Sequence, residues 1–339
     1  MHKSPGRHAT FPPAPGPASR LVSRCASIAL LCLLLAFPAL SVKGAAGGLL
    51  LWFNVVLPTL SPFIICSQMV VALGGAELLT RPFFPAVHAL FGLSRPGTYV
   101  LLCGLLCGYP LGAKMCGDFL ARGEITRAEA QYLLSICNHP SPMFLLGFVG
   151  ARLQGALTPA FLLACLYLPV LPVSLLSRRF YRITAWKKRS RKAMSICRIQ
   201  QVPQSQQTLQ YRQTSQPPTI EDVLLSTAET MVIIGGYIML FSILAVWIQQ
   251  LPFLPPGLAA CLAGIAEITT GVNQLCTVLP PDYAALPVVA TVAFGGFSGI
   301  FQTKSVIKNA GLSIRHYLFW KIIHTVCSCL TLLSAAALR

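Results

Sequence analysis

The chain has 339 residues, of which 55% are hydrophobic and only 10% charged. A typical soluble domain carries about 25% charged residues, so these charges are too few to cover the surface of a soluble protein of this length. The net charge of +17 is also typical of nucleic-acid binding. However, the basic residues lie mainly in the N-terminal segment and one loop, as the positive-inside rule expects. We therefore expect a lipid-covered membrane protein with no nucleic-acid partner.

The thirteen cysteines mostly stand singly inside apolar stretches, where cysteine acts as a small hydrophobic residue. No Cys or His spacing of a zinc site is present, so we expect no metal site and no cofactor. The sequence also lacks a paired acid/base arrangement. We therefore expect that the protein is not an enzyme.

Residues 1–20 are rich in Pro and small residues and are predicted to form a disordered tail. Residues 21–42 are apolar and long enough for an N-terminal transmembrane helix, which needs about 20 residues. A signal peptide is the competing interpretation, because the start is basic and small residues follow at Gly44, Ala45 and Ala46. The length of the apolar stretch favours the transmembrane helix.

Residues 47–177 contain apolar stretches at 47–75, 97–117 and 155–177. Pro58 and Pro62 interrupt the first, so it is predicted to be kinked or broken within the membrane. Backbone groups freed at that depth need partners in the protein or in a water-filled cavity. Either a plain kinked helix or a discontinuous helix at a solute site fits this pattern.

A polar segment lies between the last two of these stretches. Thr126 and Glu129 form a capping-box pattern that predicts the start of a helix. The turn of residues 138–142, Asn-His-Pro-Ser-Pro, then precedes apolar residues 143–150. This resembles a re-entrant hairpin whose second helix begins near Ser141 or Met143 and directs free N–H groups into the membrane.

Residues 178–218 carry eight Lys and Arg residues between positions 178 and 192 and then become Gln-rich. This composition predicts a basic linker on the cytoplasmic side. Residues 219–339 follow, with apolar stretches at 223–248, 257–279, 284–301 and 317–338. Glu229 and Glu267 lie within them, and such buried charges usually face a cavity, a partner or a pathway.

The segments 47–177 and 219–339 repeat one order of elements. Pro96-Gly97 with Gly104 in the first matches Pro256-Gly257 with Gly264 in the second, at a constant offset of 160. A broken element follows in each, and paired breaks in two halves indicate a transporter site. We therefore expect an all-α, polytopic integral membrane protein with two related halves and paired broken or re-entrant helices. The expected backbone breaks are at Pro58, Pro142, Gly295, Gly296 and Gly299.

Several longer motifs resemble the sporulation integral membrane protein YlbJ family, from about Gly47 to the C-terminus. They are Gly108-Tyr109-Pro110-x-Gly112-Ala113-Lys114, the run 122–130, residues 138–150, Glu267-Ile268-Thr269-x-Gly271 and residues 295–302. The family often has Asn-Asn-Ser-Gly-Pro where this chain has residues 138–142. The resemblance implies a nucleoside-recognition or Gate domain in each half, related to concentrative nucleoside transporters and to the membrane gate of ferrous-iron transporters. It also implies a link to endospore formation and to movement of dipicolinate, a small aromatic dicarboxylate.

Together these patterns predict a cell-membrane transporter of a small polar or anionic solute, dipicolinate-like or nucleoside-like. A non-transporting gate or scaffold protein of a sporulation complex is the alternative, and a homo-oligomer is compatible with either. The candidate substrate-binding residues are Lys114, Asn138, His139, Ser141, Glu267, Thr269, Ser298 and Gln302.

Two charged candidates have specific expected roles. Lys114 is expected to supply a point charge and to share a central cavity with Glu267, which is the candidate for binding a coupling cation or proton. For Lys114 the simpler alternative is snorkelling to the membrane interface. For His139 the simpler alternative is a structural role in the turn.

A cysteine introduced at Ser205, in the basic linker, is expected to react with a membrane-impermeant maleimide only after the cells are permeabilised, because the linker is predicted to be cytoplasmic. Labelling is measured by a mass shift of the purified protein. Modification of that cysteine in intact cells would contradict the predicted orientation.

Overall fold

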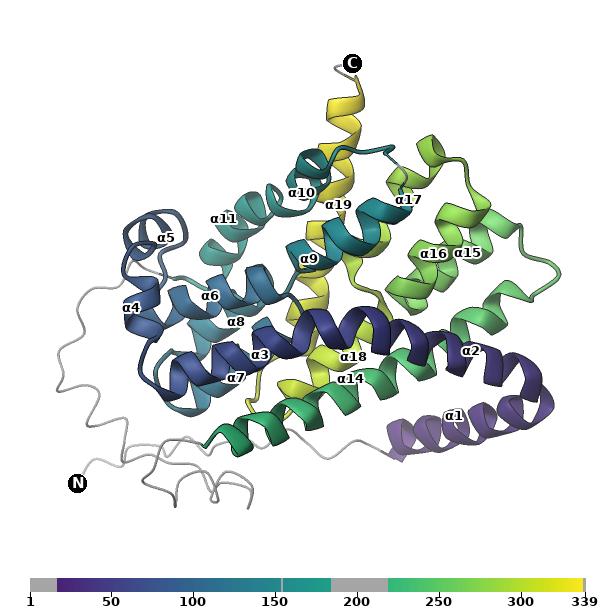
Figure 1. Ribbon diagram of the computed structural model, residues 1–339, viewed down its shortest axis with the longest axis horizontal. Helices are drawn as coiled ribbons and strands as arrows, with labels where there is room; N and C mark the ends of the chain where they lie inside the picture. Colours follow the sequence, from purple (N-terminus) through teal and green to yellow (C-terminus); the bar gives the residue numbers. More distant parts are fainter. Residues whose placement is uncertain (1–16, 154, 184–218, 338–339) are drawn as a thin grey trace, which may run out of the picture.

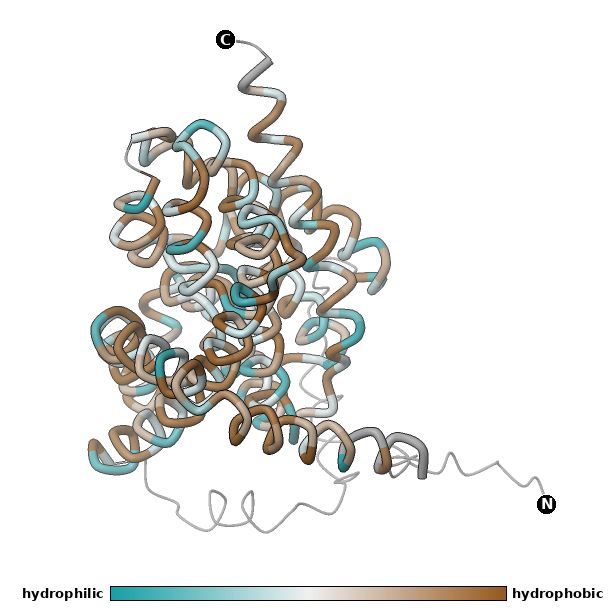
Figure 2. Tube along the Cα trace, turned by 90° about the vertical axis from the view of Figure 1, so that its right-hand side faces the viewer, coloured by the Kyte–Doolittle hydropathy of each residue, from teal (hydrophilic) through white to brown (hydrophobic). Residues whose placement is uncertain are grey.

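The fold is entirely helical over the part of the chain that this computed structural model describes, residues 17–153, 155–183 and 219–337. Five helices are long and apolar enough to cross a membrane, or six if one bent pair is counted as a span. Hydrophobic residues run along most of the chain trace in Figure 2. The prediction of an all-α polytopic membrane protein is thus confirmed. The predicted tail up to residue 16 and the linker from residue 184 to residue 218 lie outside the described residues.

The helices fall in two successive groups, drawn from purple to teal and from green to yellow in Figure 1. The first group is α1 (Pro17–Ala36), α2 (Pro38–Leu51), the π-helical turn η1 (Trp52–Val56), α3 (Leu57–Ala72), α4 (Ala76–Thr80), α5 (Phe84–Phe91), α6 (Arg95–Cys107), α7 (Leu111–Ala121), α8 (Arg127–Ile136), α9 (Pro142–Phe144), the π-helical turn η2 (Leu145–Gly150), α10 (Pro159–Tyr167) and α11 (Val170–Phe180). The second group is α14 (Ile220–Gln249), α15 (Pro256–Ala266), α16 (Ile268–Val278), α17 (Pro281–Phe294), α18 (Gly296–Val306) and α19 (Ile314–Ala337).

The N-terminal apolar stretch is divided between two helices. The prediction of a single helix over residues 21–42 is wrong at its end, because α1 stops at Ala36 and α2 starts at Pro38. Phe37 between them has φ −127° and ψ 60°, since a residue before proline is displaced from the α conformation by the proline ring. α2, η1 and α3 then continue as a single candidate span, Pro38–Ala72.

The helix is not broken at Pro58, contrary to the sequence-based expectation. The π-helical turn η1 ends two residues earlier, where the N–H of Leu57 bonds to the carbonyl of Trp52. A π turn widens the helix and so accommodates the proline ring, which in a regular helix clashes with the carbonyl four residues back. The Thr59 hydroxyl donates to the Val55 carbonyl at 2.6 Å. Pro58 therefore marks a local π turn within a continuous span.

Close packing of α2 against α14 joins the two groups, and these long helices lie side by side in Figure 1. The contact uses a Gly44-x-x-x-Gly48 pattern. A Cβ at Gly44 would lie 2.7 Å from the Cα of Ile243, and one at Gly48 would lie 2.7 Å from the Cβ of Ser242. Small residues at this spacing let two membrane helices approach closely. In η1, the Trp52 indole also donates to the Met231 carbonyl of α14 at 3.1 Å.

Each group contains a tight helical hairpin where the sequence predicted one apolar stretch. α6 and α7 pack against each other around a tip at residues 108–110, and α15 and α16 pack around a tip at Glu267. The stretches 97–117 and 257–279 therefore do not form single helices. Both hairpins begin with the Pro-Gly pair of the internal repeat, at the first turn of α6 and of α15.

The repeated glycines lie at the crossing points of these hairpins. Gly104 faces Gly112 in the first hairpin, and Gly264 faces Gly271 in the second, where a Cβ on Gly271 would collide with the backbone of Gly264. Helices can pack this closely only where side chains are absent. The constant offset of 160 thus corresponds to equivalent places in the two hairpins.

A broken helix follows each hairpin, as the sequence predicted for Pro142 and Gly295. In the first, α8 ends at Ile136 and α9 starts at Pro142, with the Ser141 hydroxyl accepting from the Phe144 N–H at 3.2 Å. In the second, Gly295 separates α17 from α18. Gly295 and Gly296, the first residue of α18, have φ values of +88° and +60°, which favour glycine. Gly299 lies inside α18, so the expectation of a break at that residue is wrong.

The predicted start of α8 is correct. Thr126 accepts from the Glu129 N–H at 3.2 Å. The Glu129 carboxylate accepts from the Ser94 N–H at 2.8 Å. Glu129 therefore ties the start of α8 to the start of α6.

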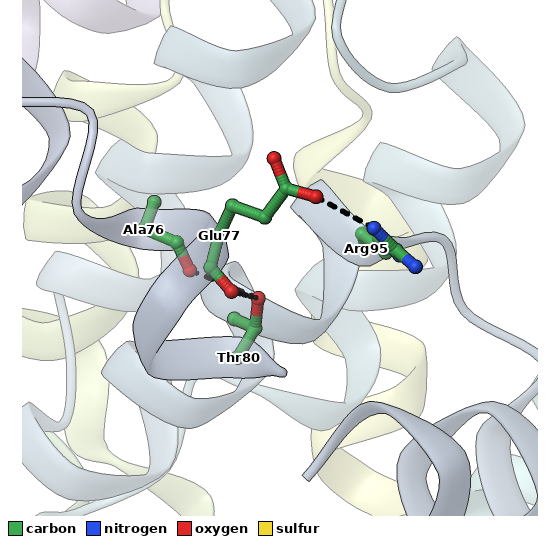
Figure 3. A network of polar contacts seen from close by, with 4 residues as sticks. All are labelled: Ala76, Glu77, Thr80 and Arg95. Carbon is green, nitrogen blue, oxygen red and sulfur yellow. Dashed lines mark hydrogen bonds and ion pairs between the residues drawn. The ribbon is translucent and has the colours of Figure 1, made fainter. Parts of the chain in front are cut away.

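An ion pair at the surface joins α4 to the first turn of α6. Arg95 Nη1 lies 2.6 Å from Glu77 Oε1, and both side chains are well exposed (Figure 3). In the same short helix the Thr80 hydroxyl donates to the Ala76 carbonyl at 2.9 Å. Exposed pairs of this kind contribute at most about 1 kcal/mol, so apolar packing rather than this pair fixes the position of α4.

Gly271→Ala is expected to lower the free energy of unfolding by about 1–3 kcal/mol, since the added methyl group overpacks the contact with Gly264. Thermal unfolding of the detergent-solubilised protein measures the effect. Gly236→Ala is the control, because a Cβ at Gly236 meets no atom within 4 Å. Equal melting temperatures for the two variants would show that the second hairpin is not close-packed.

Candidate functional site

A small pocket lies where the hairpin tips and helix breaks of both groups meet. It has a volume of about 40 Å³. Its polar lining residues come from α3, both hairpins and both breaks, and they are Thr59, Tyr109, Ser141, Glu267, Thr269, Ser298 and Gln302. The pocket therefore contains five of the eight residues that the sequence singled out.

Glu267 is the extended residue between α15 and α16, and it caps α16. Its Oε2 accepts from the Thr270 N–H at 2.7 Å and from the Thr269 hydroxyl at 2.5 Å. A carboxylate at a helix N-terminus is stabilised by the exposed N–H groups and the helix dipole. Its Oε1 accepts no hydrogen bond from any described residue, so this oxygen is available to the pocket.

The two breaks contribute hydroxyl and amide groups to the pocket. Ser141 caps α9, and Gln302 Nε2 donates to Ser298 Oγ at 2.9 Å within α18. All three side chains are buried. Among the described residues that line the pocket, Glu267 is the sole carboxylate, and Lys, Arg and His are absent. The pocket is therefore polar, with its formal charge on Glu267 alone.

Asn138 is buried but does not line the pocket. Its Nδ2 donates to Thr303 Oγ1 and to Tyr317 Oη, each at 2.9 Å, and its Oδ1 accepts from the Ala113 N–H at 3.3 Å. These contacts join the first break to α7, α18 and α19. They occupy both donor hydrogens of the amide, so Asn138 has a structural role at the first break.

Lys114 also lies outside the pocket, so Lys114 and Glu267 do not share a cavity. Lys114 Nζ pairs with Asp118 Oδ2 at 3.1 Å one helical turn along α7, and its side chain is 19% exposed. The expectation of a shared cavity was based on the internal repeat, because Lys114 and Glu267 both follow its Pro-Gly helix. Because the chain turns at residues 108–110, Lys114 lies in the second arm of a hairpin and not near the tip.

The buried cation near the pocket is Lys321 of α19, which the sequence interpretation missed. Lys321 is 2% exposed, and its Nζ donates to the Ala293 carbonyl at 3.3 Å. The Nζ also lies 5.6 Å from the ring centre of Tyr109, a residue that lines the pocket. A lysine inside the apolar stretch 317–338 was the available signal, since intramembrane charges usually mark functional positions.

His139 is buried beside His324 of α19, with ring centres 4.1 Å apart. Neither ring nitrogen of His139 has a hydrogen-bond partner among the described residues. The backbone of His139 is hydrogen-bonded, because its carbonyl accepts from the Tyr109 N–H at 3.0 Å. His139 thus lies behind the pocket and not in its lining.

Asn138→Ala is expected to lower the free energy of unfolding by about 1–3 kcal/mol, which is the cost of leaving one buried polar group unpaired. The loss is measured as a lower melting temperature of the purified protein. Ala substitution of the exposed Asn309 is the control and is expected to leave the melting temperature unchanged. A melting temperature for Asn138→Ala equal to that of the parent would contradict this structural role.

No family model matches the chain, and no solved structure matches it. The nucleoside-recognition or Gate domain implied by the sequence motifs therefore stays a prediction. The chain is 26% identical over 309 residues to "Sporulation integral membrane protein YlbJ" of Bacillus subtilis (strain 168), covering 85% of this chain and 76% of that protein. This protein is thus a multi-pass integral membrane protein that is similar to a sporulation membrane protein.

Proposed function

We propose that this chain is a YlbJ-family membrane transporter that moves a small polar solute through the pocket between its two groups of helices, in connection with sporulation. The sporulation link rests on the similarity to the Bacillus subtilis protein. The observation that carries the transport proposal is the convergence of both hairpin tips and both helix breaks on one polar pocket. Paired broken elements around a central site are typical of secondary transporters built from repeats.

The elements around the pocket also supply binding groups that a continuous helix lacks. Backbone N–H groups at the start of a helix have no intrahelical partner, and α16 and α18 both begin beside the pocket. In α16, Glu267 occupies such groups, whereas Gly295 at the start of α18 provides no side-chain cap. The start of α18 is therefore a natural donor site for a solute oxygen.

The charge of the pocket favours a neutral, hydroxyl-bearing solute of the nucleoside-like class over a dicarboxylate. Glu267 is the formal charge in the lining, and it would repel an anion in a site of low dielectric constant. Its free Oε1 can accept hydrogen bonds from sugar hydroxyls, and Gln302 can pair with a base or an amide. A dipicolinate-like solute would need a cation bound beside Glu267.

The pocket is too small for such a solute in this conformation. A volume of about 40 Å³ holds a few water molecules at most, whereas ligand sites usually enclose roughly 300 Å³ or more. Binding of a nucleoside therefore requires the hairpin tips and breaks to move apart, which is the motion expected of a transporter. The small volume is also the observation that favours the alternative, a non-transporting gate or scaffold protein.

The purified protein in proteoliposomes is expected to take up nucleosides faster than dipicolinate, because Glu267 disfavours an anion in the pocket. Uptake is measured by mass spectrometry of the washed vesicles after incubation with a mixture of both solute classes. Glu267→Gln is expected to reduce nucleoside uptake by tenfold or more while keeping an oxygen to cap α16.

Glu221→Gln is the matched control, since Glu221 is an exposed carboxylate in the first turn of α14. It is expected to transport at the parental rate. Faster uptake of dipicolinate would overturn the assigned solute class. Vesicles that take up neither solute would overturn the transport proposal and favour the scaffold protein.

A further inference from the structure

A second group of buried polar side chains lies near Tyr109, a residue that lines the pocket. Lys321 and His324 project from one face of α19, and His139 comes from the first helix break; we name these three residues the buried basic cluster. All three are at most 2% exposed. Lys321 takes part in none of the ion pairs among the described residues. Three basic groups are thus placed together without a carboxylate to neutralise them.

Some ring nitrogens of the two histidines in the cluster form no hydrogen bond and can accept a proton. His324 Nε2 lies 2.9 Å from the Leu166 carbonyl. Because a carbonyl can only accept, Nε2 carries the hydrogen, and Nδ1 is the bare nitrogen of the neutral ring. That Nδ1 and both ring nitrogens of His139 have no partner among the described residues. The cluster can therefore accept a proton without breaking an existing hydrogen bond.

The three groups cannot all be charged at once. The imidazole rings are 4.1 Å apart, and two unit charges at about 4 Å repel by about 4 kcal/mol at an effective dielectric constant of 20. The other titratable groups that face the cluster are Tyr109 from the first hairpin, Cys137 at the end of α8 and Tyr317 on α19. None of these is a carboxylate. The number of protons held by the cluster is therefore variable and not fixed by a permanent counter-ion.

The cluster touches both helix breaks that line the pocket. Lys321 donates to the carbonyl of Ala293 in the last turn of α17, where the unpaired carbonyls and the helix dipole favour a positive charge. A Cβ at Gly295 would lie 3.6 Å from Lys321 Nζ. In the first break, His139 is two residues before the pocket residue Ser141. A change in the charge of the cluster would therefore alter its interactions with both helix breaks at the same time.

We propose that the buried basic cluster is a proton-binding site that couples proton movement to solute movement. This proposal rests on the proposed transport function and identifies the proton as the coupling ion. Glu267 is the less suitable proton carrier, because its carboxylate already caps α16 through Thr269 and Thr270. The cluster instead joins the two breaks that must move for a solute to pass.

The test is solute accumulation in proteoliposomes with a pH gradient of one unit and the membrane potential clamped by valinomycin and potassium. With one proton per solute, the parent is expected to accumulate nucleoside by up to about tenfold on one side, since one pH unit corresponds to a tenfold ratio. Lys321→Met is expected to equilibrate nucleoside without accumulating it. Lys304→Met is the control, because Lys304 is an exposed lysine of α18, and it is expected to accumulate like the parent.

A second measurement serves if Lys321→Met does not fold. Addition of nucleoside to vesicles of the parent in weakly buffered solution is expected to move protons, seen with a pH indicator, and His139→Gln is expected to abolish that signal. The proton site would be overturned if nucleoside uptake did not depend on the pH gradient, or if both Lys321→Met and His139→Gln still coupled uptake to protons. Either result would leave the transport proposal intact. A parent that takes up no solute under any gradient would overturn both.

Discussion

The structure depends on one requirement: backbone groups exposed by a break inside a membrane must find partners within the protein. At the first break, the His139 carbonyl accepts from the Tyr109 N–H at 3.0 Å, and the Pro140 carbonyl accepts from the Tyr167 hydroxyl at 2.7 Å. At the second, the Ala293 carbonyl accepts from Lys321. Each break is therefore enclosed by neighbouring elements, which brings both hairpin tips and α19 to the same region.

The hairpins can fill this role because their arms are unusually close. Glycine at the crossing points removes the side chains that would hold the arms apart, and the tips can then reach the breaks. Gly108 packs against the Ser141 N–H, where a Cβ would lie only 2.7 Å away. Gly296 similarly faces the carbonyls of Ala266 and Gly264. The pocket is thus a consequence of two hairpins packing against two broken helices.

Two groups of polar residues lie near the helix breaks, and they differ in their chemistry. The pocket itself presents a carboxylate, hydroxyl groups and an amide, which can form hydrogen bonds to a neutral solute. The buried basic cluster near Tyr109 has unpaired nitrogen atoms and, among the described residues, forms no ion pair with a carboxylate. Tyr109 is near both groups, since it lines the pocket and Lys321 Nζ lies 5.6 Å from its ring centre. This arrangement is consistent with one site for solute and another for protons.

The membrane class, the helical fold and the breaks at Pro142 and Gly295 could be predicted from local sequence patterns, because hydrophobic length, proline and glycine act through local physical rules. The sequence also selected Ser141, Glu267, Thr269, Ser298 and Gln302, which line one pocket. The folding of stretches 97–117 and 257–279 into hairpins could not be predicted in this way, since an apolar run has the same composition whether it continues or turns back. The turn at residues 108–110 places Lys114 away from the pocket, and the packing of α19 places Lys321 beside Tyr109. The place of Lys321 depends on a contact between residues more than 100 positions apart, which local patterns do not specify.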